Sequence, residues 1–175
     1  MSVRVTKVTF RGKVENRDAV APLLSQSGDV VIVERGKPRL LVMRCPCGCK
    51  DDLLINLDNR VGPAWRYYLT RRGLTLFPSY WRDTACGSHF VVWNSQIYWC
   101  MGWEAAESDT WSVPISVEET VLAALPKDRF VKFDELADRL GLIPWEVLQA
   151  CQQLIKRGVV VANLRPRSGE FRRRD

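Results

Sequence analysis

The stretch Cys45-Pro46-Cys47-Gly48-Cys49, together with Cys86-Gly87-Ser88-His89, decides how this chain is organised. These two short clusters hold four of the six cysteines and the only histidine. Structural zinc sites take four tetrahedral ligands, drawn from thiolates and imidazoles. The clusters therefore predict a Zn²⁺ site. Its candidate ligands are Cys45, Cys47, Cys49, Cys86 and His89.

Five donors are one more than a tetrahedral site needs. From the first cluster we favour Cys45 and Cys47, because Gly48 lets the backbone bend after the second ligand and turn its amides toward sulfur. Cys49 is the reserve ligand. The second cluster has the Cys-x-x-His spacing of a zinc knuckle, which lets one turn present both donors.

Other interpretations of these residues stay open. The cysteines can be reduced thiols packed as small hydrophobic residues, or halves of disulfides. A Rieske-like iron–sulfur centre would need two histidines, and the chain has one. His89 could act as the base for a cysteine nucleophile. A catalytic zinc would need a general base such as Asp51, Asp52 or Asp83, but the surplus of donors favours a closed structural site.

Composition places the chain among ordinary globular proteins. Its 175 residues are 46% hydrophobic and 26% charged, which suits one or two domains. No apolar run approaches the length that spans a bilayer, and the N-terminus lacks the apolar region of a secretory signal. We therefore expect a cytoplasmic protein that is not embedded in a membrane and keeps its cysteines reduced.

Hydrophobic alternation with a period of two dominates the first two thirds of the chain. The first cysteine cluster follows one apolar run and precedes another, so it is predicted to be the tip of a β-hairpin. A second hairpin is predicted to turn at Asn94-Ser95. The predicted strands are 3–10, 30–33, 40–43, 53–57, 65–69, 74–77, 90–93 and 96–100, with a short helix at 18–24. This pattern predicts a zinc-binding β-rich domain over residues 1–112.

The pattern becomes helical after an acidic connection at Gly102–Ser112. Helices are predicted at 117–125, 133–140 and 144–157, followed by a strand at 159–161 and a turn at 167–169. Three helices followed by a hairpin are typical of a winged helix-turn-helix. We therefore predict an α+β protein whose second domain, residues 113–175, is a winged helix with a basic wing and tail.

The predicted third helix and the tail offer a binding surface for a protein or nucleic acid. Its candidate residues are Trp145, Gln149, Arg165, Arg167, Arg172, Arg173 and Arg174. A helix that reads DNA usually carries polar or basic residues early on its exposed face, whereas this one begins Pro144-Trp145-Glu146. We therefore favour protein docking over DNA reading, with weak, salt-sensitive DNA contact through the arginines.

Several short motifs resemble those of a known bacterial family. They are Cys45-Pro46-Cys47-Gly48-Cys49, Trp65-Arg66, Leu76-Phe77-Pro78-Ser79, Trp81-Arg82 and Cys86-x-Ser88-His89-Phe90. The chain resembles, over residues 38–100, a family of unknown function encoded beside ubiquitin-like proteins, ThiF-type activating enzymes and E2-like conjugating enzymes. The resemblance implies an accessory role in a bacterial ubiquitin-like conjugation system serving phage defence, with such proteins as partners.

The function expected from the sequence is a non-catalytic, zinc-stabilised adaptor that binds protein partners. The first alternative is a winged-helix regulator that binds DNA. The second is an enzyme that depends on zinc or on a thiol. The winged-helix part lies outside the resemblance, so its role is open among these alternatives.

Overall fold

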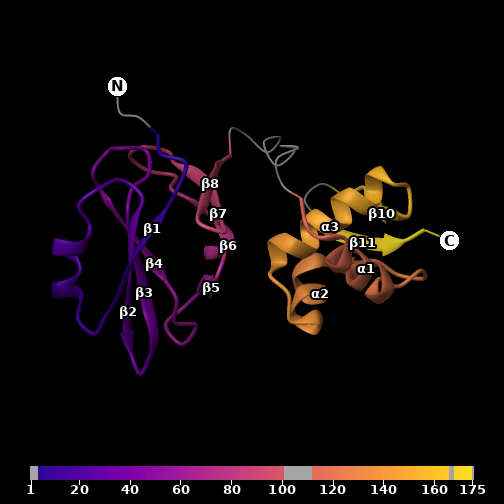
Figure 1. Cartoon of the computed structure of the whole chain (residues 1–175), viewed down its shortest axis with the longest axis horizontal. Helices are drawn as coiled ribbons and strands as arrows, with labels where there is room; N and C mark the ends of the chain where they lie inside the picture. Colours follow the sequence, from indigo (N-terminus) through magenta and orange to yellow (C-terminus); the bar gives the residue numbers. More distant parts are fainter. Residues whose placement is uncertain (1–3, 101–111, 166–167, 175) are drawn as a thin grey trace. The chain divides into compact units, whose positions relative to one another are not determined.

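The computed structural model describes residues 4–100, 112–165 and 168–174. The chain divides into two compact units, Met1–Ala106 and Glu107–Asp175 (Figure 1). The predicted acidic connection at 102–112 lies outside the described residues, apart from Ser112. The boundary that we placed after residue 112 therefore stays a prediction.

The first sheet of the first unit has four strands in the order β1-β2-β3-β4. Strand β1 runs parallel to β2, and the other neighbours are antiparallel. The predicted helix at 18–24 is instead two short 3₁₀ turns, η1 and η2, where Pro22 removes an amide donor. The bounds are β1 Thr9–Val14, η1 Arg17–Ala19, η2 Ala21–Leu23, β2 Asp29–Arg35, β3 Lys37–Arg44 and β4 Asp52–Asn56.

The second sheet is an antiparallel meander in the order β5-β6-β7-β8. Asn94 and Ser95, with φ angles of 50° and 61°, form the turn between β7 and β8. Positive φ at both positions is what a tight type I′ hairpin requires, so the hairpin predicted there is confirmed. The bounds are β5 Arg66–Thr70, β6 Gly73–Trp81, β7 His89–Trp93 and β8 Gln96–Trp99.

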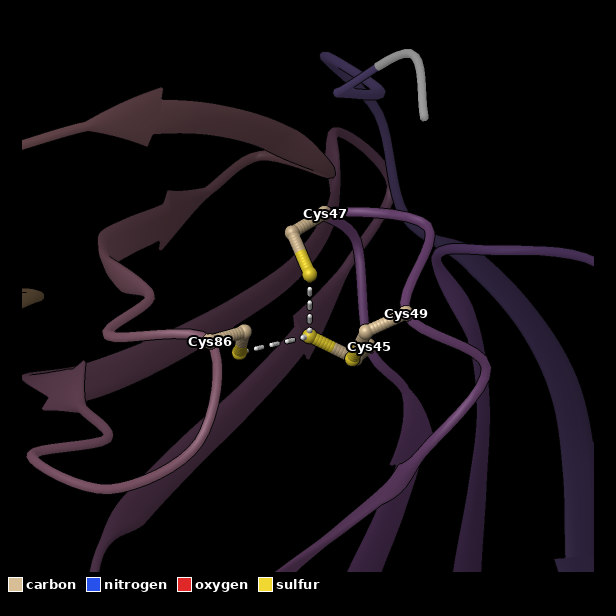
Figure 2. Close-up of side chains that lie close together, drawn as sticks. All are labelled: Cys45, Cys47, Cys49 and Cys86. Carbon is tan, nitrogen blue, oxygen red and sulfur yellow. Dashed lines mark hydrogen bonds between the residues drawn. The ribbon is translucent and has the colours of Figure 1, made fainter. Parts of the chain in front are cut away.

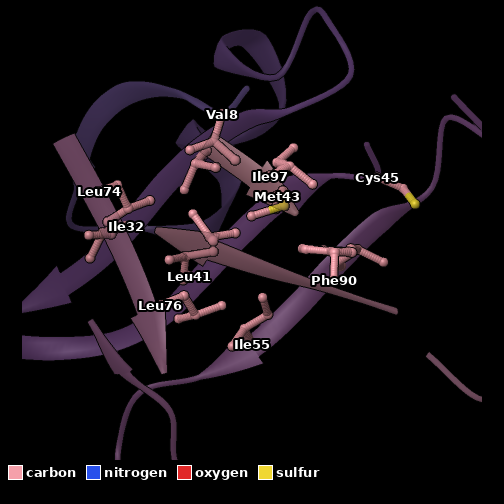
Figure 3. Packing of buried hydrophobic residues seen from close by; sticks show 13 residues of the cluster. Val8, Ile32, Leu41, Met43, Cys45, Ile55, Leu74, Leu76, Phe90 and Ile97 are labelled. Atoms are coloured by element: carbon pink, nitrogen blue, oxygen red, sulfur yellow. The ribbon is translucent and has the colours of Figure 1, made fainter. Parts of the chain in front are cut away.

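Side chains from the two sheets share one core (Figure 3). Alternate residues of each strand point into it, for example Ile32 and Leu41 from the first sheet and Leu76 and Phe90 from the second. Burying each of these side chains contributes about 1.5–3 kcal/mol. Cys45 lies at the margin of this core, so the packing of the two sheets fixes the start of the first cysteine cluster.

A second cluster covers the other face of the first sheet. Val31, Val33 and Val42 pack there against Val20 and Leu24 from the η1–η2 region. Both faces of β2 are therefore buried, which explains why its sequence is continuously apolar rather than alternating.

The second unit contains three α-helices and a three-stranded antiparallel sheet of order β10-β11-β9. Gly141, with φ of 65°, ends α2, and Pro144 occupies the first turn of α3. The bounds are α1 Ile115–Ala124, β9 Val131–Lys132, α2 Phe133–Leu140, α3 Pro144–Lys156, β10 Val160–Ala162 and β11 Glu170–Arg173. Among the described residues, no helix combines the length and apolarity that crossing a membrane requires.

A buried polar contact joins α1 to the end of α3. Glu118 is 2% exposed, and its Oε1 accepts a hydrogen bond of 2.7 Å from Gln153 Nε2. Arg157 Nη1 lies 2.8 Å from the other carboxylate oxygen. A buried carboxylate is tolerated only when it is paired in this way, so these contacts fix how the two helices pack.

Candidate metal centre and a serine–histidine pair

The two cysteine clusters come together at one end of the first unit. Strand β3 leads into Cys45, and the connection between β6 and β7 carries Cys86. The Sγ atoms of Cys45, Cys47, Cys49 and Cys86 all lie within 4.8 Å of one another. Cys45 Sγ is 3.3 Å from Cys47 Sγ and 3.8 Å from Cys86 Sγ (Figure 2).

Backbone hydrogen bonds close the first cluster into a tight loop. The Cys45 amide donates to the Asp51 carbonyl at 2.8 Å, and the Gly48 amide donates to the Cys45 carbonyl at 3.3 Å. Gly48 has φ of 86° and Lys50 has φ of 67°, both in the left-handed region. The glycine that the sequence places after Cys47 is therefore what lets the chain turn back and aim three thiols at one point.

The second loop is built around Ser88, whose side chain is buried. Ser88 Oγ lies 3.1 Å from Cys86 Sγ and 3.7 Å from Cys45 Sγ. The Arg82 amide donates to the Ser88 carbonyl at 2.8 Å, which closes the loop where β6 ends and β7 begins. Ser88 thus links the sulfur group to the first residue of β7.

Electrostatics prepare one of these thiols to lose its proton. Burial acts to raise the pKa of Cys86, but hydrogen bonds from the Ser88 hydroxyl and amide, and from the Cys47 and Cys45 thiols, outweigh it and lower the pKa to about 6. Burial raises the pKa of Cys45 well above its usual value. A cation at the centre of the group would overcome that cost by stabilising the thiolates.

Four clustered thiols can hold a metal ion. Around a tetrahedral zinc with bonds of about 2.3 Å, neighbouring sulfurs lie about 3.8 Å apart. The Cys45–Cys47 and Cys45–Cys86 separations, 3.3 and 3.8 Å, are close to that spacing. Of the five predicted donors, the structure brings together all three cysteines of the first loop, including the reserve Cys49, and adds Cys86.

His89, the fifth predicted donor, is not part of the four-sulfur group. Its Nε2 lies 3.3 Å from the hydroxyl of Ser79, and its ring packs against Trp81 with centroids 5.9 Å apart. Ser79 and Trp81 lie two residues apart on β6, and Trp81 pairs with His89 of β7. The strand pairing therefore places a hydroxyl and an imidazole in hydrogen-bonding contact.

The surroundings of His89 favour its neutral form. Partial burial lowers the pKa of the imidazole below its usual value of about 6.5. At neutral pH the ring can therefore accept a proton from a hydroxyl, which is what a general base must do. Among the described residues no carboxylate bonds to His89, so the arrangement is a pair and not a triad.

The carboxylates considered as bases for a catalytic zinc make other contacts. Asp51 forms an ion pair of 2.9 Å with Arg82, and Asp52 forms one of 3.2 Å with Arg44. Asp83 is exposed. The Asp51–Arg82 pair joins the two cysteine-bearing loops, which gives this carboxylate a structural role.

The binding residues predicted in the second unit have different environments. Trp145 is buried and stacks on Phe133, with centroids 6.4 Å apart. Gln149, which we expected on the exposed face of its helix, is only 8% exposed, and α3 packs against both other helices. Arg172 lies over the ring of Phe130. Arg165, Arg173 and Arg174 are exposed, and Arg167 lies outside the described residues.

Sequence reasoning missed Ser79. A serine in a strand is a common residue, and only the pairing of Trp81 with His89 reveals that it faces an imidazole. The one available signal was its alternation with Trp81, which places both side chains on the same face of β6.

Comparison with known proteins identifies a related family. Residues 16–100 match the model of a family described as BubE, the bacterial ubiquitination-like system serine protease. The match covers strands β2 to β8, both cysteine clusters and the Ser79–His89 pair, and it ties the chain to a bacterial ubiquitin-like system. This confirms the ubiquitin-like association expected from the sequence. No curated protein and no solved structure matches the chain.

Proposed function

We propose that the chain is a serine peptidase of a bacterial ubiquitin-like system, with Ser79 as nucleophile and His89 as general base. The observation that carries the proposal is the 3.3 Å contact between Ser79 Oγ and His89 Nε2. A nucleophile within hydrogen-bond reach of its base is the signature of covalent catalysis. The serine-protease description of the family that matches residues 16–100 supports the same assignment.

The proposed reaction uses the pair in two steps. Ser79 Oγ attacks the carbonyl carbon of a peptide bond while its proton moves to His89 Nε2. The C–N bond then breaks, and His89 returns that proton to the departing amine. A water molecule, deprotonated by His89, next attacks the acyl-enzyme ester, and its proton passes through His89 back to Ser79 Oγ. This is the template of serine hydrolases without its third member.

The cysteine group is proposed to bind zinc in a structural role. Four thiols satisfy a tetrahedral zinc and leave no position for substrate or water. When bound, the ion would supply a fixed cross-link between the two loops. Ser88, which contacts the sulfurs of Cys86 and Cys45, immediately precedes His89. The centre would thus hold the general base in place without taking part in the reaction.

A serine-directed probe tests the proposal. An alkyl fluorophosphonate should form a covalent adduct at Ser79, located by mass spectrometry of the digested protein. Ser79→Ala should abolish the adduct, and His89→Gln should slow it by at least about a hundredfold, the usual contribution of a general base. Ser116→Ala, at an exposed serine of the second unit, is the matched control and should label normally. Labelling that survives Ser79→Ala would overturn the proposal.

The adaptor role expected from the sequence is the second candidate. It draws on the second unit, which we propose to be a winged helix because three helices are accompanied by a sheet that contains the β10–β11 hairpin. In a peptidase, this unit would bind a ubiquitin-like, ThiF-type or E2-like partner. A chain that binds such a partner but shows no serine reactivity would favour the adaptor.

A further inference from the structure

Among the described residues, one edge of β6 has no strand partner beside the proposed nucleophile. Strand β5 pairs with β6 only as far as Arg66 opposite Phe77. Beyond that point the register with β7 is interrupted between Leu76 and Tyr80, and it resumes with Tyr80 opposite Phe90 and Trp81 opposite His89. Within the described part of the chain, Tyr80 and Trp81 therefore pair with β7 and have no strand partner on the β5 side.

Two hydrogen bonds establish which way the backbone groups of this segment point. The Arg82 amide donates to the Ser88 carbonyl at 2.8 Å, and the Cys100 amide donates to the His89 carbonyl at 2.9 Å. The amide and carbonyl of a strand residue point to the same side, and successive residues alternate. His89 therefore bonds away from β6, and the amide and carbonyl of its partner Trp81 face the free edge.

The side chain of Trp81 lies open at the same place. It is 67% exposed, and its ring packs against His89. An exposed tryptophan beside a general base offers apolar contact area to whatever approaches the nucleophile. The free backbone groups and this ring together form a docking strip next to Ser79.

A pocket lined by basic and aromatic side chains lies next to the strand that carries Ser79. The pocket has a volume of about 440 Å³, and its lining includes Trp65 and Tyr67 together with Lys37, Arg60 and Arg66. The Trp65 indole donates to the Ser79 carbonyl at 3.4 Å, so this ring is shared between the pocket and the nucleophile's strand.

The side chains that line the pocket carry a net positive charge. Asp58 is the single carboxylate in the lining, and both Arg60 and Arg39 pair with it. Lys37 is exposed, and the guanidinium of Arg66 lies over the Phe77 ring, 4.8 Å from its centroid. The lining thus has three cationic side chains and one anionic side chain, which suits an anionic group on the ligand.

We propose that the substrate is an extended polypeptide segment that binds as an added β-strand along the edge of β6 at Trp81, next to Ser79, with an acidic side chain in the pocket beside Trp65. Strand addition presents the scissile carbonyl to Ser79 in a fixed, extended backbone geometry. Folded helices and small esters cannot use the edge in this way. The inference rests on the peptidase function proposed above.

The test uses pentapeptidyl phosphonates, which react covalently with serine nucleophiles. The parent probe has alanine at every position, and its amides are N-methylated one at a time. Strand addition predicts that methylation slows labelling of Ser79 by about tenfold at the one position whose amide donates to the Trp81 carbonyl, and much less at the other positions. Uniform sensitivity, or none, would overturn strand addition. Trp81→Ala keeps the backbone groups of this residue and should retain the dependence on that one position.

A second series tests the pocket. Each alanine is replaced in turn by aspartate or lysine, and at one position aspartate should label at least about tenfold faster than lysine. Lys37→Glu should remove or reverse that preference, whereas Lys127→Glu, at an exposed lysine of the second unit, should keep it. No preference for aspartate at any position would overturn the assignment of the pocket. If the alkyl fluorophosphonate also fails to label Ser79, the peptidase function itself fails.

Discussion

Ser88 Oγ lies 3.1 Å from Cys86 Sγ, and the next residue along the chain is His89. The loop that completes the four-sulfur group therefore also carries the proposed general base. We therefore expect a change in the sulfur group to shift the start of β7, and with it the distance between the imidazole and Ser79. Metal binding and serine reactivity should consequently rise and fall together.

The first prediction concerns the metal itself. Purified protein should hold about one zinc ion per chain by elemental analysis, as a closed four-thiolate site requires. Removing it with a chelator should lower fluorophosphonate labelling of Ser79, because the loop that holds His89 loses its cross-link. Cys86→Ala should have the same two effects.

Cys100→Ser is the matched control for that substitution, since Cys100 is a half-buried cysteine outside the four-sulfur group. It should keep both zinc and labelling. Iron in place of zinc, or a metal-free protein with full serine reactivity, would contradict the structural role.

The second prediction is a pH profile. Burial lowers the pKa of His89 below about 6.5, and the neutral imidazole is the form that accepts a proton. The rate of Ser79 labelling should therefore rise with pH through an inflection below 6.5 and stay level above it. The His89→Gln variant, followed by the same mass measurement, should lack this inflection. Because the pKa of Cys86 is also lowered, to about 6, an inflection that persists in His89→Gln would instead point to this thiol.

The β-rich unit could be predicted from its sequence better than the site could. The alternation of apolar residues and the Asn94-Ser95 turn depend on local backbone geometry, which the sequence reveals directly. The hairpin predicted there is confirmed. Cysteines that bind one metal ion occur at characteristic spacings in a sequence, and four of the five predicted donors lie close together in the structure. The Ser79–His89 contact depends on register between two strands joined by a loop, and register is set by the shared core and not by neighbouring residues.

The third prediction tests the carboxylates near the sulfur group. Asp52→Ala and Asp83→Ala should leave zinc content and Ser79 labelling unchanged, because neither residue belongs to the proposed reaction. Asp51→Ala removes the ion pair with Arg82 between the two loops, so it should weaken zinc retention only slightly. Loss of a hydrolytic activity with zinc fully retained in any of the three would favour a catalytic zinc.

The fourth prediction concerns the stability of the second unit. Glu118→Ala should lower the free energy of unfolding by about 1–3 kcal/mol, because the half-buried amide of Gln153 loses its acceptor. Glu119→Ala changes the exposed neighbouring residue on the same helix and should have an effect within about 0.5 kcal/mol. Urea unfolding followed by circular dichroism measures both. Equal effects would show that the Glu118 contacts contribute little.

The last prediction separates protein docking from DNA reading by the second unit. Trp145 is buried against Phe133, so it is not free to contact bases, and of the arginines predicted to bind, Arg165, Arg173 and Arg174 are exposed. Such residues bind phosphates without regard to sequence, and affinity then falls steeply as salt rises. We expect weak DNA binding that is lost near physiological salt, and lost at low salt when these three arginines become alanine. Arg172 is left unchanged because its guanidinium lies over Phe130 and donates to the Lys127 carbonyl.

Fluorescence anisotropy with labelled duplexes across a salt series measures this DNA binding. Tight binding to one duplex in excess competitor would identify a sequence-reading regulator instead.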